Sequence, residues 1–166
     1  MTTERDESIG MCTEACAQVK NPDTQELLEA FEIVAHDALA FLGPDHHLHP
    51  VPAATFNLED GEPVAVSPSM ARFPFRAVLE YSGPEHPVRL RYGDREYQLA
   101  IDIALNDSAY QPLQAWLDSL GIDHDLSDDA WINTPSSLAR HTRRLAHALR
   151  DNFDHIIAAA PGAPPA

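Results

Sequence analysis

The stretch "GPDHHLHP", residues 43–50, brings His46, His47 and His49 close together in the chain. In an extended segment His47 and His49 would point to the same side, because alternate residues of a strand share a face. Two such imidazoles can bind zinc or another divalent metal, but a stable site needs at least one more ligand. No further ligand stands at a diagnostic spacing, so we favour a polar loop over a metal cofactor site.

Motifs for covalent and nucleotide chemistry are absent from the sequence. It contains no G-x-S-x-G elbow, no S-x-x-K pair and no glycine-rich phosphate loop. The two cysteines, Cys12 and Cys16, lie in a polar N-terminal segment without a secretory signal pattern. We therefore expect free thiols, a cytoplasmic location and, on balance, no enzymatic activity.

Asp102 is the one carboxylate that stands among apolar neighbours, in the segment "LAIDIAL". If both faces of its strand are covered, burial would raise its pKa and make it a candidate acid or base. The other interpretation is an ion pair with Arg89 or Arg91 across a hairpin, which is the usual role of facing charges on neighbouring strands. We favour the ion pair.

The segment "DHDLSDDAWIN" combines acidic residues with one tryptophan, Trp131. An aromatic anchor with a charged rim is typical of protein-binding hot spots. In the alternative, which we slightly favour, Trp131 and Ile132 close the end of the core ahead of the last helix. The candidate partner-binding residues are Asp123, Asp125, Asp128, Asp129 and Trp131.

The net charge of -15 excludes most nucleic-acid and anionic-lipid partners and favours a basic protein partner. The last helix nevertheless carries a cationic stripe. We expect this stripe to neutralise acidic residues of the same chain, either on the first helix or in the acidic loop. Its members, three and four residues apart, are Arg140, Arg143, Arg144 and His147.

Helical periodicity predicts three helices. The first begins with a cap at Asp23 or Thr24 and ends at Gly43 and Pro44. The second follows a capping box of Ser108 and Gln111 and is closed by Gly121. The third begins at Thr134, with Pro135 in the first helical position.

Alternating apolar residues over 72–105 predict a three-stranded antiparallel meander, with a two-residue turn at Gly93 and Asp94. The prolines of residues 43–71 restrict the segments "AATFNL" and "PVAV" to weak edge strands. One apolar sheet face needs a cover, and three amphipathic helices can supply it. These patterns predict a two-layer α+β domain over residues 23–160, with disordered tails at 1–22 and 161–166.

The functional expectation is a non-enzymatic module that binds a basic protein, in the manner of an inhibitor, an immunity protein or a chaperone. Nearly all basic residues are arginines and alanine is abundant, which suggests a bacterial gene. The rival is a metal-binding protein or metal-dependent enzyme that uses His47 and His49. A homodimer formed through an open sheet edge is a third possibility.

Overall fold

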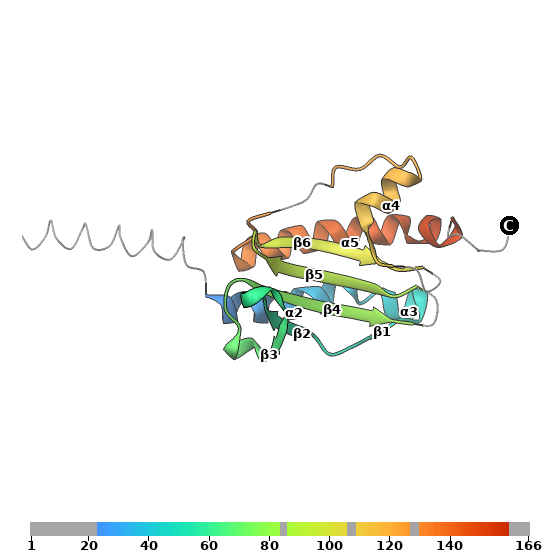
Figure 1. The fold of residues 1–166 in the computed structure, drawn as a ribbon. Coiled ribbons are helices and arrows are strands. Elements are labelled where there is room, and N and C mark those ends of the chain that lie inside the picture. Colours follow the sequence, from blue (N-terminus) through green and yellow to red (C-terminus); the bar gives the residue numbers. More distant parts are fainter. Residues whose placement is uncertain (1–22, 84–85, 106–108, 127–129, 160–166) are drawn as a thin grey trace, which may run out of the picture.

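The computed structural model describes residues 23–83, 86–105, 109–126 and 130–159 (Figure 1). It is a mixed fold of one antiparallel sheet and three substantial helices, which confirms the predicted fold class at this level. The predicted tails lie outside the described residues. No helix within the described ranges is long and apolar enough to cross a membrane.

The sheet has the strand order β3-β2-β4-β5-β6-β7, and β1 pairs with β4 outside this path. Every pairing is antiparallel. Its strands are β1 (His49–Pro50), β2 (Ala54–Asn57), β3 (Val64–Val66), β4 (Phe75–Ser82), β5 (Val88–Asp94), β6 (Gln98–Ile103) and β7 (Gln111–Pro112).

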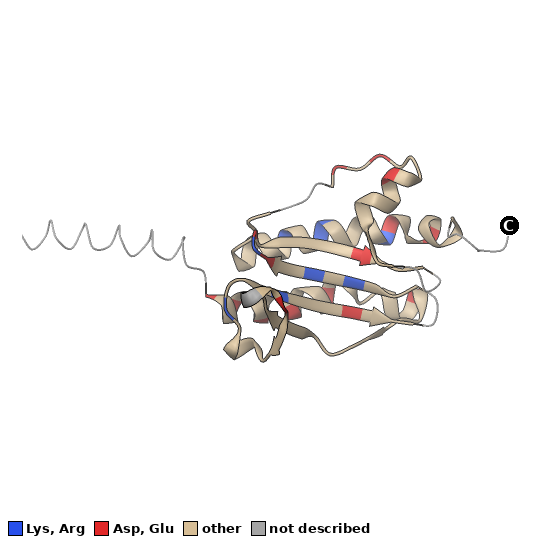
Figure 2. Ribbon diagram, viewed as in Figure 1, with Lys and Arg blue, Asp and Glu red and all other residues tan. Residues whose placement is uncertain are grey.

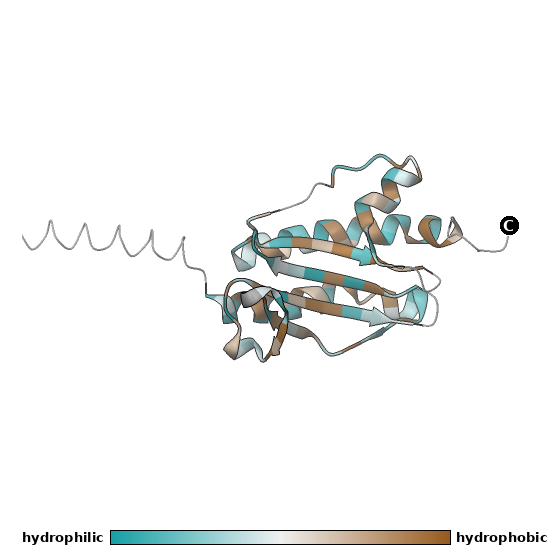
Figure 3. Ribbon diagram, viewed as in Figure 1, coloured by the Kyte–Doolittle hydropathy of each residue, from teal (hydrophilic) through white to brown (hydrophobic). Residues whose placement is uncertain are grey.

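The meander of β4, β5 and β6 forms as predicted, because its apolar residues recur at every second position. Figure 3 shows this alternation as brown and teal bands along the three strands. Leu79, Leu90 and Ile101 lie side by side in the register and are fully buried. Residues between them face the opposite side of the sheet and are mostly half-buried.

The predicted turn at Gly93 and Asp94 is wrong, because both residues belong to β5 and Gly93 pairs with Gln98. The turn lies at residues 95–97, and positive φ angles fall at Asp94, the last residue of β5, and at Tyr97. Glycine is required at position 93 for another reason. Its φ is 119°, and a Cβ there would stand 2.2 Å from the carbonyl oxygen of Phe75 on β4.

Strands β2 and β3 form a hairpin around a short 3-10 turn at Glu59–Gly61, so both predicted strands exist. The prediction that both are edge strands is wrong for β2, which pairs with β3 on one side and β4 on the other. This is possible because the flanking prolines lie outside its four residues. Among the described residues β3 has no second neighbour, so the predicted homodimer would have this edge available.

Helix α2 (Thr24–Leu39) begins as predicted, with the Asp23 carboxylate accepting the backbone N–H of Glu26 at 3.3 Å. Its predicted end at Gly43 is wrong. A second, short helix, α3 (Leu42–His46), passes through Gly43 and Pro44, because proline is tolerated in a first helical turn. The left-handed cap falls on His47 instead.

The second predicted helix is shorter than expected. Helix α4 (Leu113–Ser119) starts after Gln111, which pairs with β6 as part of β7; Ser108 lies outside the described residues. Gly121 closes α4 as predicted, with a φ of 69°. Helix α5 (Pro135–Ala158) also begins as predicted, since the Thr134 hydroxyl accepts the N–H of Ser137 at 3.1 Å.

Helices α2 and α5 pack against each other behind the sheet, as Figure 1 shows. Phe31 of α2 stacks on Tyr92 of β5 with ring centroids 5.7 Å apart, and Phe75 meets the same ring edge-on. Trp116 of α4 donates its indole N–H to the carbonyl of Ile103 at 3.2 Å. The helices thus bury one face of the sheet and leave the other, here called the open face, turned away from α2 and α5.

Candidate functional site

The open face carries three arginines on two neighbouring strands, Arg76 on β4 and Arg89 and Arg91 on β5. They stand at the half-buried positions that alternate with the core residues. Figure 2 shows basic bands on β5 with acidic bands on β4 and β6 at either side. Basic residues therefore gather on this face of a chain whose net charge is -15.

Two carboxylates bind these arginines at the surface of the sheet. Oδ2 of Asp102 accepts Nε of Arg89 at 2.9 Å and Nε of Arg91 at 3.1 Å. Asp94 accepts Arg76 Nη2 at 2.7 Å with one oxygen and Arg91 Nη1 at 3.1 Å with the other. The Asp102 side chain is only 3% exposed. The predicted ion pair is confirmed, with both arginines instead of one.

Arg89 is held in a second way, by an aromatic ring. Its Cζ lies 4.1 Å from the ring centroid of Tyr110, a cation–π arrangement. The Tyr110 hydroxyl donates to Glu80 on β4. Burial, together with the nearby Glu80 carboxylate, raises the pKa of Tyr110 above its usual value. The tyrosine therefore stays neutral and keeps donating throughout the physiological range.

These contacts leave part of each guanidinium unused. Among the described residues, Arg89 donates only through Nε, and Arg91 through Nε and Nη1. Burial alone would lower the pKa of Arg91, but hydrogen bonds and charges from Asp102 and Asp94 outweigh it and raise the pKa. The open face thus presents permanently charged donors in fixed positions.

Two hollows border the arginines. One, of about 380 Å³, is lined by Val51, Phe56 and Val78 on its apolar side and by the three arginines and Glu80 on its polar side. The other, of about 570 Å³, lies between the β2–β3 hairpin and the turn after β5. Both are lined by Pro63 and Arg76, so they lie next to each other, and we call the two hollows together the sheet groove.

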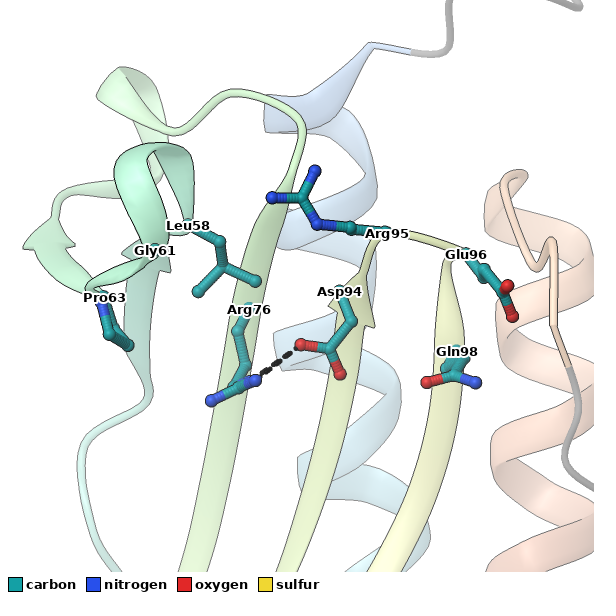
Figure 4. Close-up of a pocket in the computed structure, with 8 residues that line it drawn as sticks. All are labelled: Leu58, Gly61, Pro63, Arg76, Asp94, Arg95, Glu96 and Gln98. Carbon is teal, nitrogen blue, oxygen red and sulfur yellow. Dashed lines mark hydrogen bonds and ion pairs between the residues drawn. The ribbon is translucent and has the colours of Figure 1, made fainter.

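Figure 4 shows the larger hollow. Leu58, Gly61 and Pro63 come from the β2–β3 hairpin, and Arg95 and Glu96 from the turn on the opposite side. Arg76 and Asp94 meet on the floor through the ion pair described above. Arg76 already donates through both Nε and Nη2 to Asp94. Arg89 and Arg91 keep more donors free, so the smaller hollow is the better candidate for a ligand.

A second candidate surface is an aromatic patch made of Phe73, Tyr97 and Trp131. The Phe73 and Tyr97 rings stack with centroids 4.8 Å apart, and Trp131 lies 6.4 Å from Tyr97. Tyr97 is buried, whereas Trp131 is 62% exposed. The prediction that Trp131 and Ile132 both close the core is right only for Ile132, which is 2% exposed.

The backbone around Trp131 is firmly held although its side chain is exposed. Its N–H donates to the Glu96 carbonyl, and the N–H of Ile132 donates to the Tyr97 carbonyl at 3.1 Å. Trp131 has a φ of 61°, a left-handed conformation that a bulky residue rarely adopts. Strain of this kind persists only where the surroundings hold it, and it is concentrated at functional positions.

The acidic residues predicted to surround Trp131 are only partly described. Asp123 and Asp125 are exposed in the segment after α4, and Asp128 and Asp129 lie outside the described residues. The backbone carbonyl of Asp125 accepts Arg144 Nη2 at 2.9 Å. Arg144 of the cationic stripe on α5 therefore reaches the acidic loop, as one of the two predicted alternatives has it.

The histidine stretch does not have the geometry assumed for it. His47 is in a left-handed conformation with a φ of 58°, and His49 begins β1, so the two do not share one extended segment. His46 packs edge-on against Phe153, with centroids 4.5 Å apart. Across the described residues, no three His, Cys, Asp or Glu side chains gather as a possible metal site. Metal binding by His47 and His49 stays a prediction.

Sequence reasoning misses three members of these surfaces. Arg76 is not among the predicted site residues, although its place between Phe75 and Ala77 puts it on the open face by alternation alone. Tyr110 lies in no predicted strand, and nothing in the sequence relates it to Arg89. Alternation also places Phe73 on the core side, but it is 41% exposed ahead of β4.

Comparison with known proteins gives no family for the chain. No family model matches it, and no curated protein or solved structure is significantly similar to it.

Proposed function

We propose that the protein is a non-catalytic binding module that docks a basic protein, with Trp131 as the anchor. The observation that carries this is a tryptophan side chain that is 62% exposed on a backbone fixed by two hydrogen bonds. A segment whose backbone is already held in place loses little backbone entropy when a partner covers it. Tryptophan is also among the residues most enriched at binding hot spots.

The charge of the protein supports a basic partner. Besides the acidic loop, the outer face of α2 carries exposed acids. Among the described residues they form no ion pair with a basic side chain. Unpaired surface charge of one sign attracts the opposite sign at long range and accelerates association. The acids on α2 are Glu26, Glu29, Glu32 and Asp37.

We propose that the protein is a two-layer α+β domain that acts in the cytoplasm. An inhibitor or immunity protein for a cationic toxin is one concrete form, and a chaperone-like protein is another. In each of them Asp123, Asp125, Asp128 and Asp129 would add to the acidic rim around the anchor. The proposal assigns no reaction to the protein.

Selection from a displayed library of random peptides tests the proposal and does not require the partner to be identified first. Peptides enriched on the wild-type protein are expected to be rich in lysine and arginine. Their affinity should fall steeply as salt is raised, because the charge attraction is screened. The Trp131→Ala variant should lose about 2 kcal/mol or more of binding free energy, as for other hot-spot tryptophans.

Ile33→Ala is the matched control, since Ile33 is a 71% exposed apolar residue on α2. It should leave the binding of the selected peptides unchanged. Enrichment of neutral or acidic peptides would contradict the proposed partner. A loss of binding with Ile33→Ala but not with Trp131→Ala would show that the surface is wrongly assigned.

A further inference from the structure

We propose that the smaller hollow of the sheet groove binds a monovalent organic acid, a carboxylate attached to an apolar body. The site involves none of the residues of the aromatic patch, so it goes beyond the proposed function and can fail independently of it. Its ligand is recognised by charged donors on one side and by apolar side chains on the other.

The charged side is formed by Arg89 and Arg91, which stand two positions apart on β5 and point to the same side. Asp102 holds both through Nε, and Tyr110 covers one guanidinium face of Arg89. Among the described residues, both terminal nitrogens of Arg89 and Nη2 of Arg91 are left to donate to a ligand, whereas Nη1 of Arg91 already donates to Asp94. Planar guanidinium groups match the two oxygens of a carboxylate, and little side-chain entropy remains to be lost on binding.

The apolar side is formed by Val51, Phe56 and Val78, which line the same hollow of about 380 Å³. Val78 stands opposite Arg91 in the β4–β5 register, so apolar and charged walls adjoin directly. Small-molecule sites commonly combine an apolar lining with a few polar groups that fix orientation. An inorganic anion would use only the arginines and leave the apolar wall in water.

The charge around the site limits the ligand to one negative charge. Glu80, Asp94 and Asp102 lie beside the three arginines and balance their charge, so the site offers hydrogen-bond donors without a surplus of positive charge. The whole chain adds a net charge of -15, which disfavours polyanions such as nucleic acids. A single carboxylate can use the free donors at the lowest electrostatic cost.

Titration of the protein with octanoate, followed through the Nε–H signals of its arginines by NMR, tests this inference. The signals of Arg89 and Arg91 are expected to shift with a common saturating curve. Octanol, which has the same chain but no charge, and inorganic phosphate, which has charge but no chain, should each bind at least about tenfold more weakly. Equal binding of phosphate would overturn the inference, as would the absence of saturable shifts with octanoate.

Two variants locate the site. Arg89→Gln should weaken octanoate binding by about tenfold or more, because one charge-assisted contact is lost. Val78→Trp fills the hollow and replaces no member of an ion pair. It should abolish binding, and it provides a second test in case the Arg89→Gln variant unfolds. Arg140→Gln is the control, since Arg140 is an exposed arginine on α5. An equal loss of affinity with Arg140→Gln would show that octanoate binds through unspecific charge attraction, and it would overturn the assignment.

Discussion

The open face of the sheet and the outer face of α2 use charge in opposite ways. On the sheet, Asp94 and Asp102 each bind two arginines at distances of 2.7 to 3.1 Å. On α2, Glu26, Glu32 and Asp37 are exposed and pair with no basic residue in the described parts of the chain. Paired charges fix side chains in place, whereas unpaired charges create a field that extends into solvent.

The difference in burial determines how much each region contributes to stability. A carboxylate that is 3% exposed interacts with its arginines in a medium of low dielectric constant. If this ion pair is lost, water cannot replace it. Exposed acids are screened by salt and hydrated whether the chain is folded or not. Substitutions on the sheet should therefore change stability strongly, and those on α2 weakly.

The largest effect is expected for Asp102→Asn. The change keeps the shape of the side chain but leaves Arg89 and Arg91 without their shared carboxylate, and we expect a loss of about 2–4 kcal/mol in the free energy of unfolding. Urea denaturation measures it. Asp37→Asn on α2 is the matched control and should change stability by less than about 0.5 kcal/mol. Similar losses in both variants would remove the contrast between the two regions.

A smaller effect is expected at alkaline pH, where the tyrosines ionise. Burial raises the pKa of Tyr81, Tyr92, Tyr97 and Tyr110, so each should ionise in the folded protein above its usual value near 10. The folded state holds these protons more tightly than the unfolded state. The resulting stabilisation is complete below about pH 10 and is lost as the pH rises through the folded values.

Ultraviolet absorbance of the phenolate measures this directly. Protein unfolded in guanidinium should show about half of its tyrosines ionised at pH 10, and native protein should show a smaller fraction. Tyr110→Phe removes one of the late ionisations, together with the hydroxyl that donates to Glu80. A tyrosine that titrates normally in the wild type, and whose signal disappears in Tyr110→Phe, would contradict the described packing of the open face.

The smallest effect is expected for Glu32→Lys on α2. It reduces the repulsion within the acidic helix face and should raise stability by about 0.2–0.5 kcal/mol at low salt. The gain should disappear in about 1 M salt, where the Debye length is only about 3 Å. Thermal unfolding at several salt concentrations checks this. A gain that persists at high salt would mean that Glu32 is not simply an exposed charge.

The sequence was sufficient for the parts of the fold that depend on local patterns. The alternation through Leu79, Leu90 and Ile101 predicts the meander, and the caps at Asp23 and Thr134 predict where two helices begin. The pairing of Asp102 with arginines was also predictable, because β5 and β6 are joined by a short turn. These features involve residues that are near in the chain or related by a simple period.

Features that depend on tertiary contact were not predictable in this way. The sequence around Gly93 predicts a turn. The structure shows that glycine is required there because the carbonyl of Phe75, on another strand, approaches closely. Gly43 and Pro44 read as a helix end because nothing local indicates that a further helical turn follows. Trp131 could have been buried or exposed, since the hydrogen bonds that orient its segment come from the β5–β6 turn.

Fluorescence of Trp131 tests the central claim most directly. The Trp116→Phe variant leaves Trp131 as the sole tryptophan, and acrylamide quenching reports how exposed it is. We predict strong quenching in the free protein, with marked protection and a blue shift in emission when a selected basic peptide is bound. Weak quenching in the free protein, or quenching that the bound peptide leaves unchanged, would contradict the claim that Trp131 is the anchor of a docking surface.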